Sequence, residues 1–496
     1  MVHGKRFPRT TKTTKGAPML SARLLTALSL FAIVLSPQSA FAADSALALK
    51  GNTLGLEWGI PFVGMLLSIA TFPVIAPHFW HENFGKIAGF WAACFLIPCL
   101  LFISWETSLF VILEVLFHEY IPFILLLLAL FTVAGGIHVK GTLTGHAETN
   151  VAILVIGTVL ASWMGTTGAA MLLIRPLLRA NKDRKYKVHT VIFFIFLVAN
   201  IGGSLTPLGD PPLFLGFLNG ISFFWPTQAM FWPMVLVSVL VLIVYYLLDR
   251  FYYYPHENPA AMKVSDMTPH APLRVEGLIN FLLLVGIVGA VLLSGTWKPD
   301  WQPIKLFTVD YKTQNLTRDL LLIVITILSL RLTNNDSRAN NGFNWFPIVE
   351  VAKLFIGIFL TIAPVIAILK GGADGSLGFI IGLVSAADGQ PLPQAYFWAT
   401  GLLSGFLDNA PTYLVFFKAV GASPDAFMTT FATTLLAISM GAVFMGALSY
   451  IGNAPNFMVK AIAENEKVKM PTFFGYMAWS FSVLMPIFVI VMFVFL

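Results

Sequence analysis

Two stretches of this chain match each other at a constant separation of 243 residues. Thr206-Pro-Leu-Gly-Asp-Pro-Pro212 lies over Ser449-Tyr-Ile-Gly-Asn-Ala-Pro455, and the same shift places Gly165-Thr-Thr-Gly-Ala169 over Asp408-Asn-Ala-Pro-Thr412. The matching residues are helix breakers and polar groups inside strongly apolar sequence. Because one separation serves both pairs, the sequence predicts two structural repeats, each with the same two interruptions.

The composition indicates where these repeats reside. Of the 496 residues, 57% are hydrophobic and only 11% are charged, a balance that soluble globular domains do not have. The net charge of +6 comes from tails and loops rather than from one basic face, so it gives no support to nucleic-acid binding. The chain is predicted to be an integral membrane protein. Apolar segments interrupted by Gly and Pro in both halves of such a protein are typical of secondary transporters.

Residues 1–43 have the layout of a signal peptide. A basic start is followed by a short apolar core at 24–35 and by Ala40-Phe-Ala42, which fits a cleavage site. An uncleaved first anchor is the alternative. With either, residue 45 onward begins outside the cytoplasm of a bacterial inner membrane.

The apolar stretches define the predicted architecture. Those long enough to cross a bilayer, which takes about 20 helical residues, fall near 58–78, 86–104, 121–138, 188–218, 230–248, 277–295, 319–333, 351–369, 428–458 and 472–496. Two others, 151–180 and 395–420, break in the middle and resume, as re-entrant helical hairpins do. Each half then has five spans and one hairpin, and an odd number of spans inverts the second copy. The predicted fold class is an all-α polytopic membrane protein of two inverted repeats, with broken helices at the site.

The charges of the loops support this topology. The stretch 105–120 carries three Glu residues and no Lys or Arg, as expected of an external loop, whereas 175–187 carries six basic residues, as expected of a cytoplasmic one. The predicted domains are a first repeat at 55–248, a polar cytoplasmic linker at 249–276 and a second, inverted repeat at 277–496.

Two carboxylates stand out inside the apolar sequence. Asp210 and Asp408 are the only formally charged residues in the stretches 188–248 and 389–417. A charged side chain at bilayer depth is costly and marks a functional site by default. For Asp210, a capping role at the end of a span is the alternative, because the two prolines that follow it could mark a loop.

Prolines at the breaks remove backbone donors, so half-helix ends are expected to face a cavity within the membrane. Hydroxyl and amide side chains stand beside the breaks: Thr166, Thr167, Asn200, Ser204, Thr206, Asn409, Thr412, Ser449, Asn453 and Asn456. Oxygen ligands of this kind suit sodium or protons better than soft metals. We therefore expect a sodium site that includes Asp210, Asp408 and Asn453. Sodium would be the substrate or the coupling ion, and no further cofactor is expected.

The segments Asn200-Ile-Gly-Gly-Ser-Leu-Thr-Pro-Leu-Gly-Asp-Pro-Pro212 and Leu407-Asp-Asn-Ala-Pro-Thr412 resemble the ion transporter superfamily. The resemblance is to its citrate-transport branch, whose members are also described as sodium/proton antiporters of the NhaD type, and it covers nearly the whole chain from about residue 55. It implies dimerisation through a scaffold domain and elevator-like alternating access. The implied hairpin-tip positions are Thr166, Thr167, Asp408, Asn409 and Thr412, and the implied broken-span positions are Thr206, Asp210, Ser449 and Asn453.

One departure from the superfamily pattern bears on the substrate. Its dicarboxylate carriers have Ser-Asn-Thr at both hairpin tips, whereas here the first tip reads Gly-Thr-Thr-Gly and the second carries Asp408. A fixed carboxylate repels a dianion unless a sodium ion or a proton neutralises it. This departure favours a cation exchanger over a citrate carrier.

Three functions are compared. The favoured one is a sodium/proton antiporter in which Asp210 and Asp408 bind sodium and protons competitively, with Asn409, Asn453, Thr206 and Ser449 completing the coordination. The alternative is a sodium- or proton-coupled transporter of citrate or a related dicarboxylate. A membrane structural or signalling role without transport requires neither broken spans nor buried carboxylates.

An enzyme is not expected, since the sequence has neither an HExxH motif nor a G-x-S-x-G elbow. The expected partners are a small cation or carboxylate, the lipid bilayer and a second copy of the chain, and no nucleic acid.

Overall fold

The computed structural model describes residues 47–141, 143–257, 271–372 and 375–496. The predicted signal segment at 1–43 lies outside these ranges. Within them, eight helices are long and apolar enough to cross a membrane. Sheet structure among these residues is limited to two antiparallel pairs: β1 (His138–Lys140) with β2 (Arg274–Glu276), and β3 (Ile304–Leu306) with β4 (Val309–Tyr311). The predicted all-α polytopic membrane fold is confirmed.

The first half contains uninterrupted helices and a set of interrupted ones. Its helices are α2 (Ile60–Ile75), α3 (Pro77–Phe102), α4 (Trp105–Glu114), α5 (Ile121–Ala134), α6 (Ala147–Met164), α7 (Thr166–Ala180), α8 (Val188–Leu197), α9 (Pro211–Leu218) and α10 (Trp225–Leu247). Helices α6 and α7 form a hairpin with its tip at Gly165. Helices α8 and α9 are the two parts of a broken span.

The second half repeats this order. Its helices are α12 (Ile279–Thr296), α13 (Thr313–Leu332), α14 (Asn335–Asn340), α15 (Phe346–Lys370), α16 (Gly378–Val384), α17 (Pro393–Leu407), α18 (Asn409–Val420), α19 (Pro424–Met428), α20 (Ala432–Met445), α21 (Ala454–Asn465) and α22 (Phe473–Phe495). Helices α17 and α18 form the second hairpin, with its tip at Asp408. Helices α20 and α21 are the second broken span.

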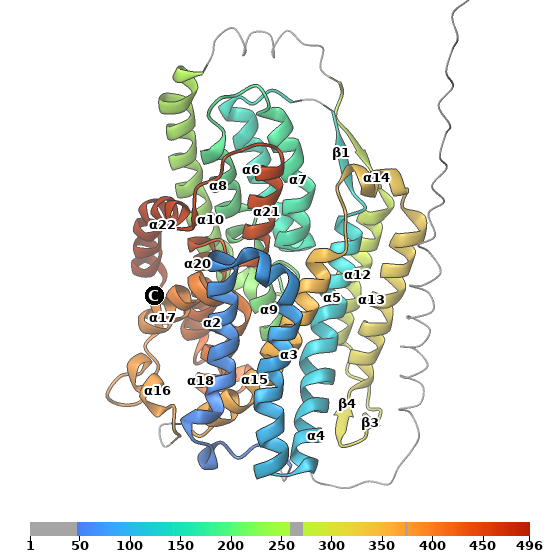
Figure 1. The fold of residues 1–496 in the computed structure, drawn as a ribbon, viewed down its shortest axis with the longest axis vertical. Coiled ribbons are helices and arrows are strands. Elements are labelled where there is room, and N and C mark those ends of the chain that lie inside the picture. The colour runs from blue at the N-terminus through green and yellow to red at the C-terminus, as the bar shows by residue number, and fades with distance from the viewer. Residues whose placement is uncertain (1–46, 142, 258–270, 373–374) are drawn as a thin grey trace, which may run out of the picture.

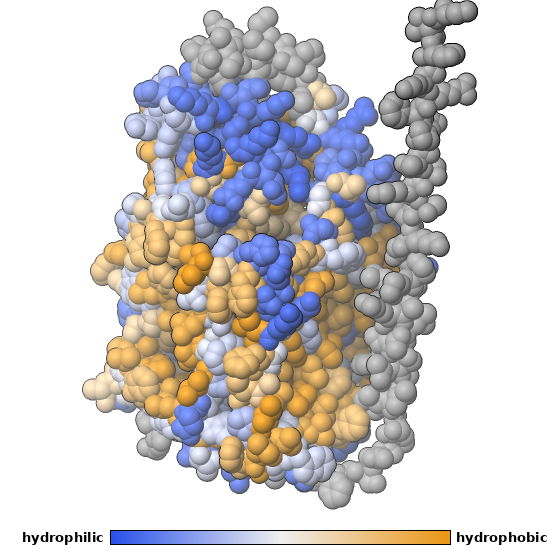
Figure 2. Space-filling model, viewed as in Figure 1, coloured by the Kyte–Doolittle hydropathy of each residue, from blue (hydrophilic) through white to orange (hydrophobic). Residues whose placement is uncertain are grey.

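The two hairpins enter the molecule from opposite ends. In Figure 1, α6 and α7 occupy the upper part and α17 and α18 the lower part. The upper end carries the segment 175–187, and we call it the basic end; the opposite end carries β3 and β4. Figure 2 shows hydrophilic residues gathered over the basic end and hydrophobic residues over most of the surface below it. The positive-inside rule predicts that the basic end faces the cytoplasm.

The interrupted elements form the centre of the core. Every residue of α8 from His189 to Leu197 is buried, and so are almost all residues of α20. A helix that is hydrophobic on all sides is stable only when protein or lipid surrounds it completely. Here the surroundings are protein, and this central position allows irregular backbone at membrane depth.

The external loop predicted at 105–120 is wrong, because this stretch is helical. Helix α4 begins after Ser104, whose hydroxyl caps it by accepting a hydrogen bond from the Thr107 amide at 3.0 Å. It continues through a π-helical segment, Val115–Tyr120, into α5. Helix α5 alone has 14 residues, too few to cross a bilayer, so the span extends into the acidic stretch.

The predicted start of the cytoplasmic linker also needs correction. The helix expected to end at residue 248 continues from α10 as a π-helical segment, Leu248–Tyr253, and a 3-10 turn to His256. Asp249 is completely buried rather than part of a polar loop. At the far end of the predicted linker, β2 pairs with β1 in the register His138 to Glu276. The buried ion pair of Asp249 with Arg184, described below, explains why the helix does not stop at the last apolar residue.

Candidate functional site

The two hairpin tips have the same backbone conformation. Gly165 has φ 80° and ψ 147°, and Asp408, its counterpart 243 residues later, has φ 97° and ψ 136°. Positive φ with an extended ψ is a conformation that residues other than Gly adopt only under strain. Its occurrence at an Asp indicates that the surrounding fold imposes it. The sequence match between the repeats is therefore a match in three-dimensional structure.

The broken spans are fixed to the hairpins by equivalent hydrogen bonds. The Thr206 hydroxyl donates to the Ser162 carbonyl, and the Ser449 hydroxyl donates to the Gly405 carbonyl at 2.5 Å. Each hydroxyl also accepts a bond at 3.2 Å from the amide two residues later. Because these donors and acceptors are already engaged, Thr206 and Ser449 position the backbone of the breaks against the hairpins.

Asp210 is the meeting point of the two repeats. Its side chain is only 1% exposed and accepts three hydrogen bonds. The Thr166 hydroxyl donates to Oδ1 at 3.2 Å, the Asn453 amide donates to Oδ1 at 2.9 Å, and the Asn409 amide donates to Oδ2 at 2.5 Å. Thr166 and Asn409 are equivalent positions at the two hairpin tips, and Asp210 and Asn453 are equivalent positions in the two broken spans. Four predicted site residues thus converge from both halves of the chain.

Asn200 extends this network. Its amide nitrogen donates to the Asn456 side-chain oxygen at 2.7 Å and to the Ile195 carbonyl at 2.8 Å. Its own oxygen accepts a bond from Asn453 at 3.3 Å. Asn456 is one of the polar residues expected beside the breaks, and it follows Pro455 directly in the second motif. Asn200 therefore orients the amide that binds Asp210.

Besides Thr206, Ser449 and Asn200, three further predicted site residues make no hydrogen bond to Asp210 in the described part of the chain. The Asp408 carboxylate caps its own helix by accepting a bond from the Ala410 amide at 3.4 Å, although it is near enough to interact electrostatically with Asp210. The Thr412 hydroxyl donates to the Asp408 carbonyl at 2.7 Å. Thr167 is half-buried and is not among the side chains bonded to Asp210. These residues lie beside the meeting point rather than in it.

Among the residues that the structure describes, no Lys, Arg or His is bonded to Asp210. The groups that donate hydrogen bonds to it are a hydroxyl and two amides, all of them neutral. The side-chain oxygen of Asn409 is buried and has no hydrogen-bond partner within the described ranges. An unbalanced carboxylate and an unpaired amide oxygen at membrane depth both cost free energy, and a proton or a small cation would relieve that cost. The carboxylate of Asp210 and the side-chain oxygen of Asn409 are hard ligands of the kind that sodium prefers, and a sodium site here stays a prediction.

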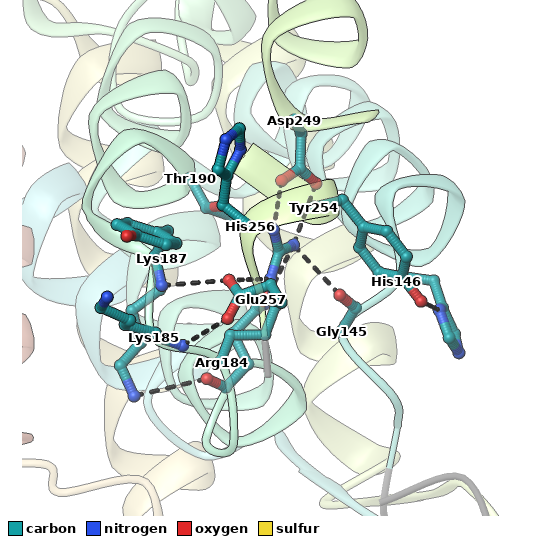
Figure 3. Close-up of polar contacts among 12 residues, drawn as sticks. Gly145, His146, Arg184, Lys185, Lys187, Thr190, Asp249, Tyr254, His256 and Glu257 are labelled. Atoms are coloured by element: carbon teal, nitrogen blue, oxygen red, sulfur yellow. Dashed lines mark hydrogen bonds and ion pairs between the residues drawn. The ribbon is translucent and has the colours of Figure 1, made fainter. Parts of the chain in front are cut away.

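A buried ionic cluster at the basic end was missed by sequence reasoning. Figure 3 shows Arg184 between Asp249 and Glu257, with Gly145 alongside. The guanidinium donates to both carboxylate oxygens of Asp249, to Glu257 at 3.2 Å and to the Gly145 carbonyl at 3.1 Å. Read from the sequence, Arg184 was one of six basic residues in a loop. Arg184 pairs with Asp249, 65 residues later in the chain, and no local sequence pattern indicates a contact over that separation.

The hairpins, broken helices and buried carboxylate define this chain as a polytopic membrane transporter. It belongs to the family described as "Putative citrate transport", which matches residues 51–496. Two curated relatives are an uncharacterised transporter of Mycobacterium bovis and one of Mycobacterium tuberculosis. Each is 23% identical to this chain over 302 residues, covering 56% of this chain and 67% of the relative.

Proposed function

We propose that this transporter exchanges sodium for protons at Asp210. The observation that carries the proposal is a buried carboxylate held by three neutral donors from both repeats, next to the unpaired oxygen of Asn409. Either a proton or a sodium ion can neutralise such a group, but its single negative charge is neutralised by only one of them at a time. Competition for a single negative charge couples the two ions.

The surrounding residues support this exchange in distinct ways. Asn409 and Asn453 carry the side-chain amides nearest to the carboxylate, and the free oxygen of Asn409 is available to a cation. Thr206 and Ser449 hold the broken helices against the hairpins. The hairpins enter from opposite ends of the molecule, so a small displacement of the whole unit could expose Asp210 to one side and then to the other.

The test uses purified protein in proteoliposomes with an imposed pH gradient. Addition of sodium should dissipate the gradient, and Asp210→Asn should abolish this effect while the protein remains folded. Potassium at the same concentration serves as the control for ionic strength. Sodium-dependent proton movement that is unchanged in Asp210→Asn would contradict the proposal.

The second candidate is coupled transport of citrate or a related carboxylate, and the description of the family favours it. In this case sodium or a proton at Asp210 would neutralise the site and allow an organic anion to bind nearby. The same proteoliposomes distinguish the two functions. Uptake of labelled citrate driven by sodium, without sodium-dependent proton movement, would favour the carboxylate carrier over the exchanger.

A further inference from the structure

A cavity of about 540 Å³ opens at the end of the molecule opposite to the basic end. It lies between α4, the π-helical segment 115–120, β4 and α15 on one side, and the last residues of α9 and α18 on the other. Its titratable lining residues are Glu114, His118, Glu119, Asp310, Lys370 and Lys418. Six titratable residues in one cavity between apolar helices indicate a function, because burying charged groups among such helices costs free energy.

Two helices connect this cavity with Asp210. Helix α9 begins directly after Asp210 and ends at Leu218, which lines the cavity; its eight residues span about 12 Å at 1.5 Å per residue. Helix α18 begins at Asn409, which binds Asp210, and carries Lys418 near its other end. Asp210 itself does not line the cavity. The cavity is therefore an outer chamber, one short helix away from the buried site.

The electrostatics of the chamber favour cations. Helices α9, α15 and α18 all end at it, and a helix C-terminus carries a partial negative charge. Lys370 and Lys418 stand in the last turns of α15 and α18, where they offset those helix ends. The Lys418 ammonium is also held by the Asn219 side-chain oxygen. The two lysines are thus already matched by nearby negative charge.

Three carboxylates line the chamber against two lysines, so the carboxylates are not fully balanced. Glu114 lies 3.0 Å from His118, which in turn contacts the Asp310 carbonyl at 3.1 Å. Glu119 forms no ion pair among the residues that the structure describes; Lys418, His118 and Lys370 attract it at longer range, and Glu114 repels it. Glu119 also sits in the π-helical segment 115–120, and such bulges occur frequently at functional sites. Its carboxylate is the group in the chamber best placed to attract a cation.

We propose that this chamber is the extracytoplasmic entrance for the transported cation and that Glu119 draws the cation in. The direction of attraction rests on the proposed sodium/proton exchange, whereas the electrostatic character of the chamber can be measured without any transport. A carboxylate substrate would require the opposite preference.

The first test measures the potential inside the chamber. In a background with Cys94 and Cys99 replaced by Ala, Ala363→Cys places a thiol on the α15 wall. Its rates of reaction with positively and negatively charged methanethiosulfonates, added from the extracytoplasmic side, are compared with those of Ser423→Cys, an exposed position after α18. Ala48→Cys, which also lines the chamber outside any helix, replaces Ala363→Cys if that variant does not fold.

The ratio of the cationic to the anionic rate should be about two- to fivefold higher in the chamber than at Ser423→Cys, more so at low salt. Adding Glu119→Gln should bring the ratio toward the reference value. Glu106→Gln removes an exposed carboxylate from the same helix outside the chamber and should leave the ratio unchanged. A ratio equal to or below the reference, or labelling only from the cytoplasmic side, would overturn the proposal.

The second test measures transport in the same variants. Glu119→Gln should raise the external sodium concentration for half-maximal proton movement about two- to fivefold and leave the maximal rate unchanged, because a surface charge acts on encounter rather than on exchange. Glu106→Gln should change neither value. If the labelling ratio behaves as expected but wild-type protein moves no protons in response to sodium, the proposed exchange fails and the chamber stands. Normal sodium/proton exchange together with a labelling ratio equal to that of Ser423→Cys would overturn only the proposal about the chamber.

Discussion

At the scale of single residues, the two membrane carboxylates differ in their surroundings. Asp210 accepts bonds from three side chains of both repeats, whereas Asp408 caps its own helix. We expect Asp210→Asn to fold but to lose sodium-dependent proton movement at every pH, because the exchangeable charge is gone. Asp408→Asn should reduce the rate without abolishing it, since Asn caps helices as well as Asp does. Both variants are compared by the dissipation of a pH gradient in proteoliposomes, and equal loss in both would show that the two carboxylates act as one unit.

Asn453 is the second residue whose contribution can be isolated. It donates to Asp210 at 2.9 Å and is the counterpart of Asp210 in the second repeat. Hydrogen bonds to charged groups contribute about 1.5–3 kcal/mol, so Asn453→Ala should raise the sodium concentration for half-maximal exchange about tenfold or more. Exchange itself should persist, because the carboxylate remains. Thr412→Ala is the matched control, since its hydroxyl bonds only the backbone of its own helix. A sodium requirement unchanged by Asn453→Ala would remove this amide from the site.

At the scale of secondary-structure elements, the backbone conformation of the first hairpin tip favours glycine, whereas the second tip holds Asp408 in a similar conformation under strain. Gly165 has φ 80°, and a Cβ there would come no closer than 3.4 Å to other atoms, so the penalty for Ala is conformational rather than steric. Gly165→Ala should lower the free energy of unfolding by about 1–3 kcal/mol. Gly289→Ala, in the open middle of α12, should raise it by about 0.5–1 kcal/mol. Thermal unfolding in detergent measures both changes, and equal shifts would show that the tip is not strained.

The helix end after α10 depends on the buried Arg184 cluster. Removing one member of a buried ion pair typically costs about 3–5 kcal/mol, because the partner charge stays buried. Arg184→Gln should therefore lower the unfolding midpoint strongly, because Asp249 would keep only its contacts with His189 and the Tyr245 hydroxyl. Lys182→Gln, an exposed residue of the same segment, should have little effect. Similar midpoints for the two variants would mean that water reaches the cluster.

At the scale of the whole molecule, the opposite entry of the two hairpins predicts opposite labelling of their outer ends. Asp183→Cys and Ser423→Cys place thiols at exposed positions after α7 and α18. In a cysteine-free background, a membrane-impermeant reagent should reach the first only from the cytoplasmic side and the second only from the other side. Asn181 is unsuitable for this purpose, because it is buried and exchanges two amide hydrogen bonds with Asn150. Labelling of both positions from one side would refute the inverted arrangement.

The sequence by itself determined the membrane environment, the two repeats and most of the broken elements. Apolar length and paired helix breakers are local properties, so the motifs at Gly165, Thr206, Asp408 and Ser449 could be recognised without coordinates. The helical state of 105–120 was missed because local charge was taken as evidence for a loop. Helix α5 is too short to cross the bilayer by itself, and α4, which lies in the acidic stretch, supplies the remaining length. Hydropathy alone did not reveal this.

Only the tertiary structure decided which polar residues meet. Asp210 and Asp408 were both candidates in the sequence, but the fold directs Asn409 rather than Asp408 toward Asp210. The direction of a side chain at a strained tip depends on the backbone that surrounds it, and no spacing rule encodes that. The pairing of Arg184 with Asp249 and the chamber around Glu119 likewise join segments far apart in the chain. Such contacts arise from packing of whole helices, so they become visible only when the helices are placed together.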